Sequence, residues 1–255
     1  MTIRIVADST CDLPAETVAR YGIRIVPLYI NVGAQGFQDG IDMTREEFSR
    51  RLPLFPAHPT TAAPGPQKFR ELYDSLTSEG ATHILSIHIS GRLSSAVDVA
   101  RFAVQETTST DVTVFDSRQL SLGTGFLVET AAVLAAQGRP IGEITASLND
   151  QIKRSHVFAA LDTLEFLKRS GRMNGIAAGL GSLLQIKPIM TMYDGKPGVV
   201  RVRTRRRATE RLFEMLRGVG AIERVAIVHT HTSVLPSCVS GQEGSNLMAM
   251  FRQWT

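Results

Sequence analysis

The chain has few of the residues that carry redox, metal or membrane functions. Its 255 residues include two cysteines, Cys11 and Cys238, too few for a disulfide framework or a CxxC metal motif. No window approaches the ~18 to 20 consecutive apolar residues of a membrane-spanning helix. The N-terminus enters a strand-like run at Ile3 and shows no signal peptide. We therefore expect a cytoplasmic protein with no cofactor, no metal site and no stable membrane insertion.

Nucleic-acid-binding motifs are also missing, although the chain is basic. Aromatic residues make up 6% of the sequence, and no helix-turn-helix, zinc finger or RNA-stacking motif is present. Much of the excess positive charge, +4 overall, lies in the segment Arg201–Arg207, RVRTRRR. Such a run is found on solvated surfaces, at contacts with acidic partners and at nucleic-acid interfaces. We expect no nucleic-acid binding and leave solvated surface and partner contact open.

The common catalytic motifs are absent too. The sequence has no GxSxG elbow, no Walker P-loop and no dinucleotide fingerprint at a strand–turn–helix position. Gly123-Thr124-Gly125, near the start of a predicted helix, is the nearest approach to a phosphate-binding turn. Cys11 lies between Asp8 and Asp12, whose charges would raise the pKa of its thiol and make it a poor nucleophile. These features predict a binding protein.

Two patterns of secondary structure divide the chain. Up to about residue 155, strand-like and helical segments alternate, which is typical of a doubly wound, mostly parallel α/β sheet with ligands beyond the carboxyl ends of its strands. From residue 156 we expect a second, smaller α/β sheet domain that contains a β-hairpin. The predicted domains are 1–155 and 156–255. Predicted strands cover Ile3–Ala7, Ile23–Ile30, His83–Ile89, Val112–Phe115, His156–Leu161, Ile186–Tyr193, Val199–Arg205 and Arg224–His229; predicted helices cover Pro14–Tyr21, Thr44–Leu52, Pro66–Glu79, Leu93–Gln105, Leu120–Ala136, Ile141–Ser155, Leu164–Arg169 and Ala208–Arg217.

Two segments place small hydroxyl groups at chain reversals. They are Pro59–Pro64 (PTTAAP), which we expect to be a stiff extended loop, and Ile89–Ala96 (ISGRLSSA). Their hydroxyl groups and loop amides would donate hydrogen bonds to an anion without supplying a strong nucleophile or base. The pattern therefore predicts that the protein holds a small acid.

Polar residues also surround the strand ends. Alternation over His83–Ile89 places Ser86, His88 and Ser90 on one face, which we expect to face the ligand, with His88 in a hydrogen-bonding role. Asp12, close before Pro14, is expected to cap the first helix. Asp8-Ser9 and Asp116-Ser117 each follow a predicted strand, which is a weak internal similarity in the sequence.

Taken together, these motifs resemble the DegV family of bacterial fatty-acid-binding proteins. The resemblance covers about residues 3–231 in the right order, which is far more specific than any single motif. Six segments carry the resemblance, and each is given with its sequence here followed by the family pattern. They are Asp8–Pro14 (DSTCDLP; DSxxDLP), Val26–Ile30 (VPLYI; VPLxI), Pro59–Pro64 (PTTAAP; PTTSQP), Ser90–Ala96 (SGRLSSA; LSGTxxSA), Leu164–Met173 (LEFLKRSGRM; LxxLxxGGRI) and Leu183–Ile189 (LLQIKPI; LLxIKPI).

The resemblance implies two α/β domains with a long-chain acyl group, such as palmitate, buried between them. Thr61 and Ser90, with Gly91 beside them, would hold the fatty-acid carboxylate. The resemblance also implies that the protein carries the acyl group and presents its carboxyl to a fatty acid kinase, with Arg172 and Arg203 facing that partner. It implies no catalysis by the chain itself. The alternative is a small-molecule enzyme that holds a phosphate group at the Ser90 and Gly123 turns.

The sequence departs from the family pattern at three places. Ala62 and Ala63 replace the usual Ser and Gln, which thins the hydrogen bonding around the head group. Arg92 stands where the family has Thr, and we hypothesise that it pairs with the carboxylate; the alternative is a surface side chain that points away. The closing HxGPGxxG motif of the family is missing after His231.

Overall fold

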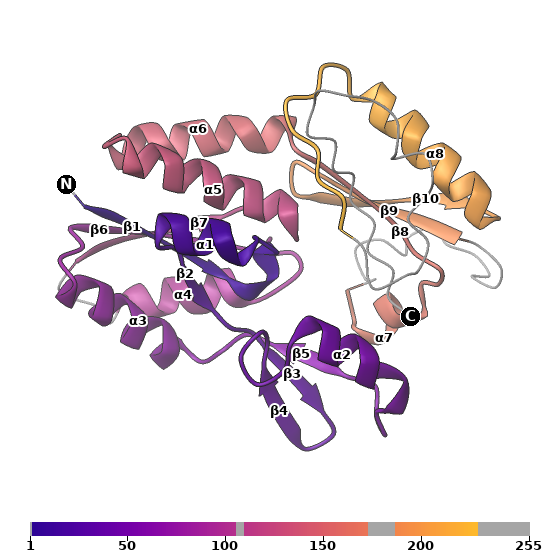
Figure 1. Ribbon diagram of the computed structural model, residues 1–255, viewed down its shortest axis with the longest axis horizontal. Coiled ribbons are helices and arrows are strands. Elements are labelled where there is room, and N and C mark those ends of the chain that lie inside the picture. Colours follow the sequence, from indigo (N-terminus) through magenta and orange to yellow (C-terminus); the bar gives the residue numbers. More distant parts are fainter. Residues whose placement is uncertain (1, 106–109, 173–186, 229–255) are drawn as a thin grey trace. The chain divides into compact units, whose positions relative to one another are not determined.

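The computed structural model describes residues 2–105, 110–172 and 187–228 (Figure 1). The chain divides into two compact units: Met1–Ser155 with the turn Tyr193–Gly195, and His156–Met192 with Lys196–Thr255. Both units contain a β-sheet with packed helices, so the predicted α/β class is confirmed. Among the described residues, no helix is long and apolar enough to cross a membrane.

A four-stranded parallel sheet forms the centre of the first unit. Its strands are β1 (Ile3–Asp8), β2 (Arg24–Val26), β6 (His83–His88) and β7 (Asp111–Asp116), in the order β2-β1-β6-β7. Ala7 pairs with Ile87, and His88 pairs with Asp116. Because the strands are parallel and in this register, the chain segments that follow β1, β6 and β7 meet at one edge of the sheet, where α/β proteins bind ligands.

Helices cover both faces of this sheet, as the doubly wound prediction requires. On one face, α1 (Ala15–Tyr21), α5 (Leu122–Ala136) and α6 (Ile141–Arg154) pack with Ile5, Leu85 and Ile87. On the other, α3 (Pro66–Ser78) and α4 (Ala96–Gln105) pack with Val6 and Ile84. The alternation of residues 84, 85 and 87 between the two clusters follows from the two-residue period of a strand.

Residues 27–64 form an insertion with a sheet of its own, which was not predicted. Its antiparallel strands β3 (Tyr29–Val32), β4 (Gln35–Gln38) and β5 (Thr60–Ala62) have the order β4-β3-β5, and α2 (Arg45–Arg51) and the short 3-10 helix η2 (Leu52–Leu54) precede β5 (Figure 1). The strand predicted over Ile23–Ile30 is therefore split at Pro27, which has no amide hydrogen to donate to a sheet. The predicted loop Pro59–Pro64 contains β5.

The second unit has a three-stranded sheet of order β10-β9-β8. Its elements are β8 (His156–Ala160), α7 (Glu165–Arg169), β9 (Lys187–Tyr193), β10 (Lys196–Val202) and α8 (Arg205–Gly218). Asp194 and Gly195, both at positive φ, make the tight turn of the predicted hairpin. The apolar side of α8 packs on this sheet through Ala208 and Leu212.

The strand predicted over Val199–Arg205 lies three residues earlier, as β10, and two other predictions in this unit are wrong. The helix α8 begins at Arg205 rather than Ala208, because the Thr204 side chain accepts a hydrogen bond from the Arg207 amide and caps it there. The strand predicted over Arg224–His229 is not present at residues 224–228, and His229 lies outside the described residues.

Candidate functional site

The turn after β6 is centred on Ser90, which is buried, with 1% of its surface exposed. The Ser90 carbonyl accepts hydrogen bonds from the amides of Leu93 (2.9 Å) and Ser94 (3.1 Å), which closes the turn. The Ser90 hydroxyl oxygen accepts the Arg92 amide at 3.3 Å. Among the described residues this hydroxyl has no acceptor of its own, so its proton can be donated to an anion.

Two aspartates hold this turn from the neighbouring strands. Asp8, at the end of β1, accepts the Ile89 amide at 2.9 Å, and Asp116, at the end of β7, accepts the Gly91 amide at 3.3 Å. A side chain at position 91 would place its Cβ 3.0 Å from Val97 Cγ1 and 3.2 Å from Asp116 Oδ2, so glycine allows this close approach. The aspartates of the two Asp-Ser pairs in the sequence therefore have equivalent roles: each accepts a turn amide, one from β1 and one from β7.

Those supports occupy the amides that were expected to bind an anion. The Ser90 amide donates to the Gln119 carbonyl at 2.9 Å, and every amide from Ile89 to Ser94 has an acceptor within the protein. The amides of this turn are therefore paired within the protein, and binding of an acid by them stays a prediction.

A buried chain of hydrogen bonds lies behind the turn. Tyr73 donates to Ser86 at 2.8 Å, Ser86 contacts His88 Nε2 at 2.7 Å, and His88 Nδ1 lies 3.2 Å from Asp8 Oδ2. All four side chains are buried and bonded to one another, so Ser86 and His88 belong to an internal network. His88 does take a hydrogen-bonding role: a carboxylate only accepts, so Nδ1 carries the proton.

The charge state of Asp8 follows from these contacts. Burial alone would raise the pKa of Asp8, but the hydrogen bond and charge of His88, with bonds from Thr10 and Ile89, hold it below its ordinary value. Asp8 is therefore an ionised carboxylate within the core.

Asp12 has a different role from the predicted helix cap. It adopts the left-handed conformation (φ 57°), and its carboxylate accepts hydrogen bonds from Arg45 and from the hydroxyl of Ser121. Pro14 holds the position before α1. The capping aspartate is Asp8, whose side chain accepts the Thr10 amide at the start of the 3-10 helix η1 (Ser9–Cys11).

Cys11 and the glycine pair do not form a catalytic or phosphate site. Burial, with the charges of Asp8 and Asp12, raises the pKa of the Cys11 thiol to about 12. The amides of Gly123 and Gly125 already donate within the first turn of α5, at 3.0 Å each. A Cβ on Gly125 would overlap the Cys11 carbonyl, so this glycine serves the packing of α5 on η1. The phosphate-holding alternative loses its support.

The other predicted head-group residues differ in their surroundings. Thr61 is exposed in the middle of β5, where it pairs with Ile30 of β3. Arg92 is exposed beside Ser90, and its guanidinium has no ion-pair partner among the described residues. The turn thus brings Ser90, Gly91 and Arg92 together, while Thr61 comes from the insertion.

In the second unit, most of the basic run is paired internally. Arg205 makes two 2.7 Å bonds to Asp162, and Arg207 donates to Glu214 at 2.8 Å. Arg203 is exposed, and among the described residues it makes no ion pair. Arg172 is half-buried and donates to the Ser170 carbonyl at 3.1 Å.

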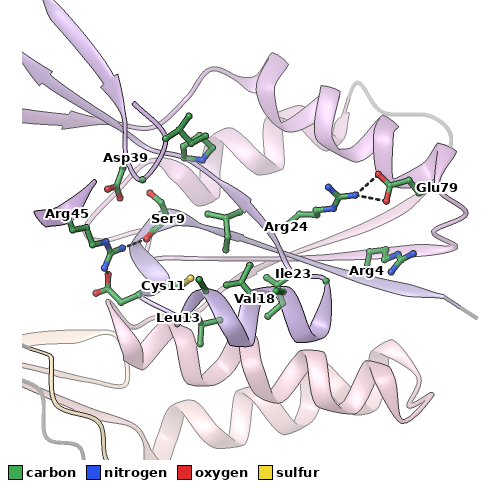
Figure 2. A pocket seen from close by; sticks show the side chains of 18 residues that line it. Arg4, Ser9, Cys11, Leu13, Val18, Ile23, Arg24, Asp39, Arg45 and Glu79 are labelled. Carbon is green, nitrogen blue, oxygen red and sulfur yellow. Dashed lines mark hydrogen bonds and ion pairs between the residues drawn. The ribbon is translucent and has the colours of Figure 1, made fainter. Parts of the chain in front are cut away.

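A separate groove of about 700 Å³ lies in the first unit, between α1, the edge strand β2 and the base of the insertion (Figure 2). Its middle is lined by apolar side chains such as Val18 and Ile23. Arg45 lies at one end and the Arg24–Glu79 ion pair at the other (Figure 2). None of the predicted head-group residues lines it.

Several residues that hold the Ser90 turn and the insertion in place were not predicted from the sequence. Gln119, Ser121 and Arg45 reach the site from segments far apart in the sequence, and no local motif marks them. The repeated Asp-Ser pair was the one feature of the sequence that could have indicated the roles of Asp8 and Asp116.

Comparisons with known proteins agree on one family. The model of the family described as "Uncharacterised protein, DegV family COG1307" matches residues 2–236. A "DegV domain-containing protein" of Deinococcus radiodurans is 37% identical over 218 residues, which is 85% of this chain and 77% of the relative.

Solved structures give the same result. A Thermus thermophilus structure described as "Fatty Acid Binding of a DegV family Protein" is 38% identical, with a TM-score of 0.77 over 86% of this chain and 78% of that one. The Bacillus subtilis structure described as "DegV, a fatty acid binding protein" is 29% identical, with a TM-score of 0.78 over 86% and 78%.

Proposed function

Because the chain belongs to the DegV family, we propose that it binds a long-chain fatty acid and holds the carboxylate with Thr61, Ser90 and Arg92. The observation that carries this proposal is the similarity, at 38% identity over 86% of the chain, to a Thermus thermophilus protein described as fatty acid binding. The Ser90 turn adds a buried hydroxyl that donates to no acceptor within the described part of the chain.

Burial of the acyl chain supplies the driving force. Each buried methylene contributes ~0.8 kcal/mol, so about fourteen of them contribute ~11 kcal/mol before losses. Association costs of ~4 to 15 kcal/mol reduce this gain. Micromolar or tighter binding remains within reach when the head group is also satisfied.

A cation would stabilise the head group further than hydroxyl groups alone. A carboxylate is not buried without hydrogen bonds or a counter-charge. The carboxylates of Asp8 and Asp116 hold the turn amides and add negative charge on either side of it. We therefore propose that Arg92, which lies on this turn, supplies the compensating positive charge and pairs with the fatty acid.

Titration with palmitate and with its methyl ester tests this assignment. Ser90→Ala, Thr61→Val and Arg92→Ala should each weaken palmitate binding by about tenfold or more, since a hydrogen bond to a charged group contributes ~1.5 to 3 kcal/mol. Ester binding should change little. Arg101→Ala, which breaks an exposed pair with Asp98 on α4, is the matched control for Arg92. Unchanged palmitate affinity in Arg92→Ala would refute the pairing.

We also propose that the protein carries the acyl group in the cytoplasm, a compartment consistent with only two cysteines. There it would present the carboxyl to a fatty acid kinase, which transfers the γ-phosphoryl group of ATP to a carboxylate oxygen and releases ADP. Arg172 and Arg203 are proposed to contact that kinase. The exposed guanidinium of Arg203, with no ion pair among the described residues, supports this role.

A kinase-coupled assay separates carrying from binding. Arg203→Ala should keep palmitate affinity and slow acyl-phosphate formation, because the lost contact is to the enzyme. Arg206→Ala, which removes an exposed arginine 3.6 Å from Glu210, serves as the control. Equal rates for Arg203→Ala and wild type would count against this surface.

A further inference from the structure

The insertion that carries Thr61 is not part of the main core. Neither hydrophobic cluster of the parallel sheet contains a residue between 27 and 64. The insertion has its own buried residues, including Ile30, Val32 and Met43. Its position relative to the Ser90 turn therefore depends on contacts at its base rather than on a shared core.

Polar contacts from α2 and β3 to η1 make up much of that base. Arg45, at the start of α2, forms an ion pair with Asp12 and donates to the Ser9 carbonyl at 2.8 Å (Figure 2). The Leu28 amide, just before β3, donates to the Ser9 hydroxyl at 3.1 Å. Burial would lower the pKa of Arg45, but the charges of Asp12 and Asp39 raise it, so the guanidinium stays charged.

The same Asp12 carboxylate connects to the Ser90 turn. The Asp12 side chain is 2% exposed, and its second oxygen accepts the hydroxyl of Ser121. Ser121 ends the β7–α5 loop, whose Gln119 carbonyl accepts the Ser90 amide at 2.9 Å. A buried bond from Ser117 of this loop to Thr124 of α5, at 3.0 Å, holds the loop in place.

We propose that the Arg45–Asp12 ion pair is a positioning pair that sets Thr61 of the insertion in register with Ser90 of the parallel sheet. The inference rests on the proposed function, in which both hydroxyl groups bind one carboxylate. Asp12 is the point where the two supports meet: Arg45 reaches it from the insertion, and Ser121 reaches it from the loop behind Ser90. Loss of the pair would leave both hydroxyl groups in the protein but at a variable separation.

The acid-to-ester selectivity of the full chain tests this role, because a merely structural defect would weaken both ligands alike. Palmitate and methyl palmitate are titrated into wild type, Arg45→Met and Arg45→Lys. In Arg45→Met, the preference for the acid should fall about tenfold, as expected when one hydrogen bond to a charged group is lost. Arg45→Lys keeps the charge and should restore part of the preference.

Two further variants make the result decisive. Arg45→Met alone leaves a buried Asp12 carboxylate without its cation, which destabilises a protein, so the double variant Asp12→Asn/Arg45→Met removes both charges. It should show the same loss of acid preference. Arg24→Met breaks the ion pair with Glu79 at the other end of the same groove and should leave the preference unchanged.

The outcomes separate the inference from the proposed function. Wild type that binds neither ligand, or does not prefer the acid, refutes the proposed function. Wild type that prefers the acid, together with an unchanged preference in Arg45→Met and the double variant, refutes the positioning pair alone. A loss shared by Arg24→Met would also refute it, because the effect would then belong to the groove as a whole.

Discussion

The Ser90 turn and the Thr61 strand are held in opposite ways. Ser90 is buried at the edge of a parallel sheet, where Asp8 and Asp116 fix the backbone on both sides of it. Thr61 is exposed on a small antiparallel sheet joined to the rest of the unit through Arg45 and the residues around it. One hydroxyl group is fixed by the core, and the other by a polar contact.

This difference separates stability from binding. Changes behind Ser90 disturb a buried network, so they should cost folding free energy first. Changes at Thr61 or at Arg45 should affect ligand binding more than the core. The following predictions test this contrast, from the largest expected change in stability to the smallest.

Asp8→Ala should be the most damaging substitution. It leaves the Ile89 amide and His88 without their acceptor inside the core. Removing one partner of a buried pair costs ~3 to 5 kcal/mol of unfolding free energy. Urea denaturation measures this loss, and Asp98→Ala, at an exposed ion pair on α4, should stay within ~0.5 kcal/mol. A loss below ~1 kcal/mol for Asp8→Ala would contradict the account of this turn.

The same carboxylate predicts an acid-sensitive stability. The pKa of Asp8 in the folded protein lies below its ordinary value of 3.8, so the unfolded chain takes up the proton first as the pH falls. The ionised Asp8 carboxylate contributes its full share of the unfolding free energy above pH 3.8, the ordinary pKa. That share is lost as the pH falls from 3.8 through the lower pKa of the folded protein. Urea denaturation between about pH 6 and pH 3 should show a smaller acid loss in Asp8→Asn than in wild type. Parallel curves for the two proteins would exclude this origin.

Two glycines in neighbouring helices should respond in opposite directions. Gly125→Ala forces α5 away from the Cys11 carbonyl and should cost ~1 to 3 kcal/mol, as overpacking of a core does. Gly142, in α6, has open space where a Cβ would lie, with nothing within 4 Å outside its chain neighbours and its own helix backbone, so Gly142→Ala should stabilise by ~0.5 to 1 kcal/mol. Thermal unfolding of both variants checks the signs. A tolerated Gly125→Ala would mean that α5 and η1 are not in close contact.

Ser90→Ala and Thr61→Val compare the two hydroxyl groups directly. Ser90→Ala removes the buried acceptor of the Arg92 amide and should cost ~1 to 2 kcal/mol. Thr61→Val, on an exposed strand, should change stability by less than ~0.5 kcal/mol. Both should weaken palmitate binding. Denaturation of the ligand-free variants measures their difference in unfolding free energy. Equal losses of stability in the two variants would contradict the difference proposed between Ser90 and Thr61.

Local patterns in the sequence predicted the parallel sheet and the helices around it well. The alternating strand at His83 and the periodic helix at Ile144, Leu148 and Ile152 carry their own signals, and both are confirmed. The insertion was missed because β5 has three residues, too few to show a period. Pro27 also divided what read as one apolar strand.

Sequence alone placed the Ser90 turn but not the contacts that support it. Ser90, Gly91 and Arg92 are neighbours in sequence, so their proximity needed no knowledge of the fold. The contacts that hold them join residues 81 positions apart, Asp8 with Ile89, or 109 apart, Asp12 with Ser121. The sequence alone therefore suggested that Asp12 caps the next helix, whereas the fold uses it to join distant segments.

Mass spectrometry of small molecules extracted from freshly purified, denatured protein tests the central claim most directly. We predict a long-chain fatty acid in about one-to-one proportion with the chain, and a much smaller amount from the Ser90→Ala/Arg92→Ala double variant. A wild-type extract without fatty acid, unchanged after the protein is incubated with palmitate, would contradict the claim.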